Sequence, residues 1–173
     1  MEHDRELLGR LESAPTTELH GSLWRVTYAG MAPARSNVRG ARWNPKDVPA
    51  LYLSTTLECA LAEFEYRHEM QPISPSLGWQ SHEFRVELNR VLDLSDPSEL
   101  DGLNLELDSQ PEGLGGYGPF QQIGGGAAFL NFEAMVVPSL RFDGTNVVAF
   151  TANIEAAGSS ELALIASRPV ARS

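Results

Sequence analysis

Residues 50–68, ALYLSTTLECALAEFEYRH, change from a strand pattern to a helix pattern within a few positions. The apolar run at 50–54 is short and ends at hydroxyl residues, which is typical of a buried strand. Ser54, Thr55 and Thr56 then offer N-caps for a following helix. The helix is expected to bury one stripe, made of Leu57, Ala60, Leu61, Phe64 and His68.

The preceding part of the chain predicts a helix, a strand and a long loop. Leucines at helical spacing predict a helix over 4–13, and alternation predicts a strand over 23–28. Residues 30–47 are rich in Gly, Pro, Asn and Arg, so they are expected to form a loop. Loops of this length inside compact domains are more often functional than not.

The part after residue 68 predicts mostly strands, several of them adjacent late in the chain. A short helix is expected to start at Asp96–Ser98, and a longer one at 120–132 despite glycines at 124–126. Strands are expected at 82–87 and 91–94, which read as one strand broken near Asn89, and at 134–138, 147–151 and 162–166. The pattern predicts an α+β fold in a single domain over 1–173, with central strands and short flanking helices.

Length, charge and cysteine content narrow the class of protein. The chain has 173 residues, a formal net charge of −10 and one cysteine, Cys59. No internal disulfide is therefore expected, and neither a secretory leader nor a membrane-spanning segment is recognisable, so a cytoplasmic protein is expected. An acidic surface repels phosphate backbones, so direct nucleic-acid binding is not expected. The histidines lack ligand spacing, so no metal site is expected.

Three residues in the first half have side chains suited to anions or flat rings. Arg25 on the strand at 23–28 could grip a carboxylate or a diphosphate, although an arginine exposed on an edge strand is the commoner situation. Arg42 in the loop could also bind anions. Tyr52 could stack on a ring and offer a hydroxyl, or it could be an ordinary strand residue. Trp43 between them is more typical of core packing.

Two further residues are candidates for a cleft. Glu63 flanks the expected buried stripe of its helix, and an i,i+4 pair with Arg67 is the simpler explanation for it. Ser139 follows a strand and a proline. No GxSxG elbow or well-placed histidine accompanies it, so it is expected to act as a hydrogen-bond donor or a turn residue rather than a nucleophile.

In combination and in this order, these motifs resemble the RES domain, the toxin component of bacterial toxin–antitoxin pairs whose antitoxins have an Xre-type DNA-binding fold. The matching segments are LWRVTY, GARWNPKDVPALYLSTTLECALAEFE, FQQIGGGAAFL and VVPSLRFDGTNVVAF, and they define a motif-bearing core at 23–150. The resemblance implies a fold like that of ADP-ribosyltransferases. It also implies an enzyme that consumes NAD⁺ by cleaving the nicotinamide–ribose bond, with NAD⁺ as substrate and no cofactor.

The resemblance also implies roles for single residues. Arg25, Tyr52 and Glu63 correspond to catalytic positions, with Glu63 as the acidic residue of the site. Arg25 and Arg42 would hold the phosphates or ribose of NAD⁺, and Tyr52 would stack near the nicotinamide. A carboxylate suits this reaction because departure of nicotinamide leaves an oxocarbenium-like ribose.

The remaining implied NAD⁺-binding residues are Gln121, in the helix-start motif, and Ser139, as the family serine. One departure from the family pattern stands near them. Many relatives have a serine or threonine about three residues before the glutamine, where this chain has Gly118. A missing hydroxyl at that position would weaken activity or change the acceptor.

The acceptor of the ADP-ribosyl group stays open between water and phosphate, which give a glycohydrolase or a phosphorylase. Two alternatives also stay open: mono-ADP-ribosylation of a protein target, and a non-catalytic module that binds NAD⁺ or another ligand. The resemblance implies an Xre-type antitoxin as partner, and self-association into a homo-oligomer is left open.

Overall fold

The computed structural model describes residues 4–71, 77–105 and 118–171. The strands are β1 (Thr16–Tyr28), β2 (Ala50–Ser54), β3 (Trp79–Asp93), β4 (Ala134–Pro138), β5 (Thr145–Phe150) and β6 (Glu161–Val170). The helices are α1 (Arg5–Ser13), α2 (Leu57–Met70), α3 (Pro97–Gly102), α4 (Gly118–Phe129) and α5 (Thr151–Ala157). The α+β class expected from the sequence is confirmed. None of these helices is long and apolar enough to cross a lipid bilayer.

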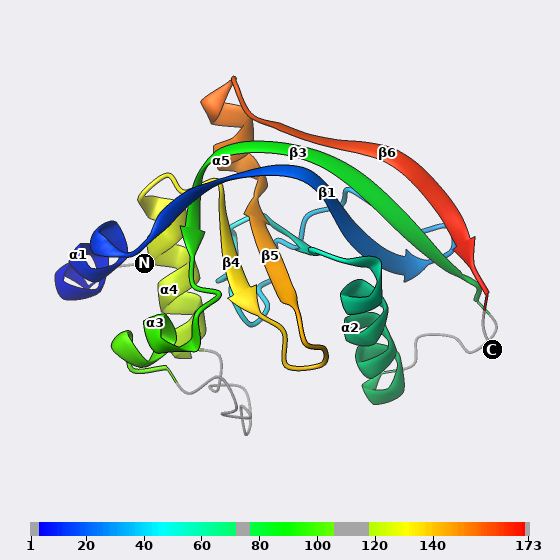
Figure 1. Cartoon of the computed structure of the whole chain (residues 1–173), viewed down its shortest axis with the longest axis horizontal. Coiled ribbons are helices and arrows are strands. Elements are labelled where there is room, and N and C mark those ends of the chain that lie inside the picture. Colours follow the sequence, from blue (N-terminus) through cyan, green and yellow to red (C-terminus); the bar gives the residue numbers. More distant parts are fainter. Residues whose placement is uncertain (1–3, 72–76, 106–117, 172–173) are drawn as a thin grey trace.

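All six strands belong to one sheet that curls and closes on itself where β1 pairs with β3. The order is β1-β2-β5-β4-β3-β6, and β1 also pairs with β3 along most of its length. The long strands β1, β3 and β6 arch over the molecule, and α2 lies beneath them (Figure 1). Because β1 has neighbours on both sides, it is not an edge strand.

The expected break near Asn89 is wrong, since β3 is one continuous strand. The register between β1 and β3 shifts between Thr17 and Leu19, opposite this region. The Asn89 backbone N–H donates instead to Oε2 of the buried Glu133, at 2.8 Å. The Glu133 carboxylate thus replaces the backbone acceptor that the register shift removes, and β3 continues through Asn89 without a break.

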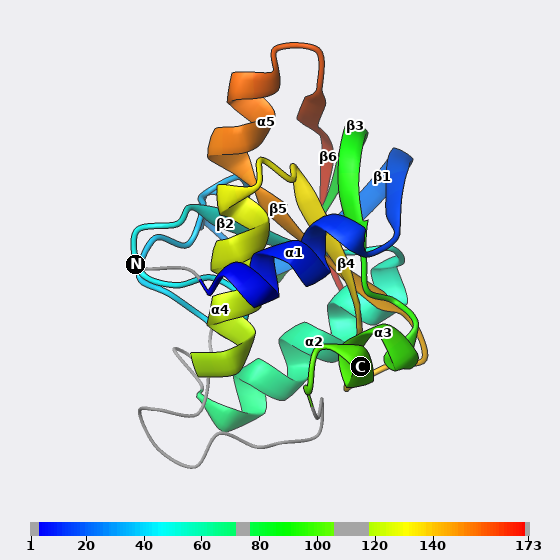
Figure 2. The same cartoon turned by 90° about the vertical axis from the view of Figure 1, so that its left-hand side faces the viewer.

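Apolar contacts fix α2 against the inner side of the arch. Thr56 caps the helix by accepting from the Cys59 N–H at 3.2 Å. Ala60 and Phe64 of the predicted stripe are buried and pack with Tyr28 and Trp79 at the end of the arch. The helices α1, α3 and α4 gather at the opposite end (Figure 1), and the end view shows α1 lying across α4 (Figure 2). The sheet therefore has α2 near one end and α1, α3 and α4 near the other, while α5 lies apart from both groups, between β5 and β6 (Figure 1).

The glycines of α4 allow neighbouring segments to approach the helix closely. A Cβ at Gly124 would lie 1.6 Å from the carbonyl oxygen of Trp43, and one at Gly126 would lie 2.9 Å from a methyl group of Leu11. Glycine lowers helix propensity by about 1 kcal/mol relative to alanine. Because these glycines have no side chain, α1 and the loop before β2 can pack directly on α4. This packing offsets the low helix propensity of the glycines and explains why the segment is helical.

His82 on β3 is 1% exposed and joins three strands. Its Nε2 lies 2.8 Å from Oγ1 of Thr27 on β1, and its Nδ1 lies 2.7 Å from Oγ of Ser167 on β6. Burial, followed by the nearby charge of Arg25, lowers the pKa of His82 below its usual 6.5. The folded state therefore binds this proton less readily than the unfolded state does.

Above about pH 6.5 His82 is neutral in both states, and we expect it to leave the free energy of unfolding unchanged. As the pH falls below 6.5 towards the lower folded-state pKa of His82, the unfolded state takes up the proton first, and we expect the free energy of unfolding to decrease. Urea unfolding of the wild type and of His82→Asn between pH 8 and pH 5 would measure the effect. The exposed His20→Asn serves as control. Equal pH slopes in the wild type and the His82 variant would contradict this assignment.

Candidate functional site

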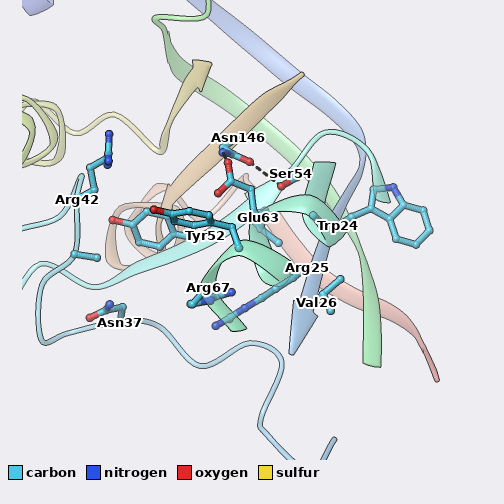
Figure 3. Close-up of a pocket in the computed structure, with 14 residues that line it drawn as sticks. Trp24, Arg25, Val26, Asn37, Arg42, Tyr52, Ser54, Glu63, Arg67 and Asn146 are labelled. Atoms are coloured by element: carbon cyan, nitrogen blue, oxygen red, sulfur yellow. Dashed lines mark hydrogen bonds between the residues drawn. The ribbon is translucent and has the colours of Figure 1, made fainter. Parts of the chain in front are cut away.

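A cleft with two connected lobes opens between α2, β2, β5 and the loop at 30–47 (Figure 3). The larger lobe has a volume of about 310 Å³ and the smaller one about 210 Å³. Both lobes are lined by the same central residues: Arg42, Tyr52, Glu63, Tyr66 and Asn146. Arg25 and Arg67 line only the larger lobe. The structure thus brings four residues predicted from the sequence, Arg25, Arg42, Tyr52 and Glu63, into one cleft.

Glu63 is held by two donors on one oxygen atom. Its Oε1 accepts from Ser139 Oγ at 2.6 Å and from Asn146 Nδ2 at 2.6 Å. Its Oε2 accepts no hydrogen bond from the described part of the chain. Two short bonds fix the plane of the carboxylate, which leaves the second oxygen for a ligand.

The simpler explanation for Glu63, an ion pair with Arg67, is wrong. No contact within ion-pair distance joins these two side chains in the described residues. The carboxylate acts on the arginine only over a longer range, where it opposes the lowering of the Arg67 pKa by burial. Glu63 is therefore oriented by neutral donors and not neutralised by a neighbouring cation.

Asn146 is the central residue that the sequence analysis missed. It lies on β5, where Ser54 of β2 is its cross-strand partner. Its Oδ1 accepts from Ser54 Oγ at 2.7 Å, so its amide NH₂ points to Glu63 (Figure 3). The only signal in the sequence would have been the register between these two strands, which a single sequence does not provide.

Arg25 and Arg67 place two cations in the larger lobe (Figure 3). Arg25 is half-buried, and its Nη1 donates to the carbonyl oxygens of Pro33 at 2.7 Å and Arg35 at 3.2 Å. Burial, and then the charge of Arg67, lower the pKa of Arg25 to about 10, so Arg25 stays charged at neutral pH. The alternative of a solvated edge-strand arginine is wrong for Arg25, which both anchors the loop and faces the cleft.

Arg67 differs from Arg25 in its contacts. Its guanidinium lies 5.4 Å from the centroid of the Phe64 ring and donates no hydrogen bond to the described residues. Burial is the largest influence on its pKa and lowers it. Arg67 is therefore available to a ligand, and the sequence analysis treated it only as a partner for Glu63.

The hydroxyl of Tyr52 holds the loop in place, while its ring forms a wall of both lobes. The hydroxyl donates to Asn44 Oδ1 at 2.7 Å and accepts from the Trp43 N–H at 3.1 Å. Asn44 is completely buried and donates to the Asn37 and Val48 carbonyl oxygens. The ring of Tyr52 is consequently fixed at the cleft wall.

Trp43 fills the core as its residue type suggested, with its ring edge-on to Phe120 at 5.1 Å between centroids. The guanidinium of Arg42 lies 5.1 Å from the centroid of the same Phe120 ring. Phe120 of α4 therefore supports two consecutive loop residues, and Arg42 is directed towards the cleft from that support.

Gln121 and Ser139 line neither lobe, but each donates a hydrogen bond to a residue that does. Gln121 Nε2 donates to the Ala41 carbonyl oxygen at 2.8 Å and so ties α4 to the loop. Ser139 contacts Glu63, as described above. Direct contact of either side chain with NAD⁺ stays a prediction. Gly118 is the first residue of α4, and a Cβ there would meet no described atom within 4 Å.

Arginines line both lobes of this cleft although the chain carries a net charge of −10. Residues 19–46 contain no Asp or Glu. The basic residues in that stretch are Arg25, Arg35, Arg39, Arg42 and Lys46. A cleft lined by cations around one oriented carboxylate suits a ligand that is anionic in one part and becomes cationic in another.

Comparisons with known proteins identify the family and show a similar fold. A family model described as the RES domain matches residues 22–171. A search of curated proteins found no significant match. The fold is similar to that of a chain in the crystal structure of the MbcT–MbcA toxin–antitoxin complex of M. tuberculosis, with a TM-score of 0.78 and 22% identity over 96% of this chain and 93% of the other. The family match spans most of the sequence, and the chain therefore belongs to the RES-domain family.

Proposed function

We propose that this chain is a toxin that consumes NAD⁺ by breaking the bond between nicotinamide and ribose. The observation that carries the proposal is the carboxylate of Glu63, which two donors hold by one oxygen in a cleft lined by arginines. Membership of the RES-domain family supports the same reaction.

The residues present fit the requirements of this bond cleavage. Departing nicotinamide leaves positive charge on the ribose, which the unbonded Oε2 of Glu63 would stabilise. Arg25, Arg42 and Arg67 would bind the diphosphate and fix the orientation of the ribose. The ring of Tyr52 offers a flat surface for the nicotinamide. Because nicotinamide leaves as a neutral molecule, the cleft needs no general acid.

An antitoxin is the proposed partner. The similar fold from M. tuberculosis was solved in a toxin–antitoxin complex, and an uncontrolled NAD⁺-consuming enzyme would damage its own cell. We propose a cytoplasmic protein inhibitor of the Xre type that covers the cleft. DNA binding would belong to that partner, because the acidic charge of this chain disfavours it.

Incubation of the purified chain with NAD⁺ tests the function directly. We expect free nicotinamide to accumulate with time and enzyme concentration, as measured by chromatography. Transfer of labelled ADP-ribose to proteins of a lysate, without free ADP-ribose, would establish mono-ADP-ribosylation instead. Binding of NAD⁺ without nicotinamide release would establish a non-catalytic module, for which Gly118 is the specific indication.

A further inference from the structure

We infer that Ser54 and Cys59 are positioning residues for the reaction, because both donate to the side-chain amide of Asn146, which in turn holds the carboxylate of Glu63. The inference rests on the proposed function, since it explains how this carboxylate is aimed at the ribose. The sequence suggested Ser54 only as a helix cap and Cys59 only as an unpaired thiol. Both are buried, Ser54 with 4% and Cys59 with 0% of its surface exposed.

Ser54 acts on Asn146 from the neighbouring strand. It is the last residue of β2 and stands directly opposite Asn146 of β5 in the antiparallel register. Side chains in this relation lie on the same face of the sheet. The hydroxyl of Ser54 donates to Asn146 Oδ1 at 2.7 Å (Figure 3). Since Thr56 caps α2, the helix does not require the hydroxyl of Ser54, which is left to hold Asn146.

Cys59 supplies a second donor to the same oxygen atom. Its Sγ lies 3.5 Å from Asn146 Oδ1 and 3.7 Å from the carbonyl oxygen of Thr145. That carbonyl already accepts from the Thr55 N–H at 3.1 Å, so the thiol is directed mainly to Asn146. Burial raises the pKa of Cys59, and the thiol therefore keeps the proton that it donates. Because a thiol is a weak donor, its contribution should be smaller than that of Ser54.

The two donors determine which atoms of the amide face Glu63. With Oδ1 bonded to Ser54 and Cys59, Nδ2 of Asn146 points to Glu63 Oε1 and donates to it at 2.6 Å. The opposite orientation would set the amide oxygen against an ionised carboxylate oxygen, and the two would repel each other. The buried donors thus favour the one orientation in which Asn146 can hold the carboxylate.

The position of Cys59 on α2 connects this donor to the carboxylate that it serves. Cys59 precedes Glu63 by four residues, so both side chains lie on the same face of the helix. The terminal torsion of a glutamate side chain is soft, and Ser139 alone would hold Oε1 by a single bond. Asn146 provides the second bond, which keeps Oε2 directed at the ribose. Misplacement of a reacting group by about 1 Å can slow a reaction about a hundredfold.

Nicotinamide release by Ser54→Ala, by Asn146→Ala and by the double variant tests this series of contacts. We expect Ser54→Ala to lower kcat by about tenfold or more with little change in the KM for NAD⁺, because the carboxylate is misaligned while the contacts that bind NAD⁺ remain. If Ser54 acts through Asn146, the double variant should be no slower than Asn146→Ala alone. Cys59→Ala should show the same pattern with a smaller loss of kcat.

Ser81→Ala is the matched control. Ser81 is also a buried serine on a strand, its hydroxyl donates to the Arg168 carbonyl oxygen at 3.3 Å, and it lines neither lobe. This variant should retain the wild-type kcat. A wild-type kcat in Ser54→Ala, an equal loss in Ser81→Ala, or effects of Ser54→Ala and Asn146→Ala that multiply would overturn the positioning role and leave the proposed function intact.

Nuclear magnetic resonance of the free chain gives a measurement that does not depend on turnover. The side-chain amide protons of Asn146, identified by their loss in Asn146→Ala, should exchange with water slowly in the wild type and faster in Ser54→Ala. Unaltered exchange would refute the positioning role. If the wild type releases no nicotinamide, the proposed function fails, and this exchange alone decides whether Ser54 holds Asn146. If Ser54→Ala does not fold, Cys59→Ala replaces it in both measurements.

Discussion

Replacement of Glu63 by Gln is expected to reduce nicotinamide release by about a thousandfold or more, the size of effect seen when a group that stabilises transition-state charge is removed. The variant keeps the shape of the side chain and an oxygen able to accept from Ser139 or Asn146. It loses the negative charge that would face the developing oxocarbenium ion. The loss should therefore appear in kcat, with a small change in the KM for NAD⁺.

The comparison needs a control on the same helix. Glu65 is exposed on α2 and lines neither lobe, so Glu65→Gln should retain wild-type turnover. Thermal unfolding of both variants checks that the fold is intact. A Glu63→Gln enzyme that released nicotinamide at the wild-type rate would remove Glu63 from the mechanism.

Replacement of Gly124 by Ala is expected to destabilise the protein by about 3 kcal/mol and to abolish turnover. The added methyl group would lie 1.6 Å from the Trp43 carbonyl oxygen, a backbone atom that cannot rotate away. Overpacking of this kind typically costs about 1–3 kcal/mol, and more where backbone must move. Relief requires displacement of the loop from α4, which would carry Arg42 out of the cleft.

Gly9→Ala serves as a control, because alanine at this position is expected to stabilise the protein instead of destabilising it. Gly9 lies inside α1, and a Cβ there meets no described atom within 4 Å. Alanine should therefore stabilise α1 by up to about 1 kcal/mol through helix propensity. Urea unfolding measures both variants. Equal stability of Gly124→Ala and the wild type would contradict the close packing of the loop on α4.

Most of the described helices and strands could be predicted from the sequence. The strand at 50–54 has the predicted bounds, and the helix after it begins next to a predicted cap, Thr56. The helix at 120–132 was predicted within a few residues of α4, despite its glycines. Hydrophobic spacing, capping and turn residues act over a few positions, so a single sequence contains the information needed to place such elements.

The sequence also indicated which residue types could act in a site, but it did not show how those residues are arranged in space. Arginine, tyrosine and glutamate in a particular order indicated a family and a reaction. The partners that orient Glu63 come from other elements, and they are Asn146 and Ser139. These contacts depend on strand register and on the packing of α2 against the sheet. Local sequence patterns contain no information about either of them.

The sequence by itself thus predicted the described helices other than α5, most of the described strands, the family and the residues proposed to act on NAD⁺. The tertiary structure decided which oxygen of Glu63 is occupied and why glycine is needed inside α4. The reason is physical. Propensity and periodicity are local, whereas a cleft is made by contacts between residues such as Glu63 and Asn146, which lie far apart in the sequence and meet only when the sheet closes.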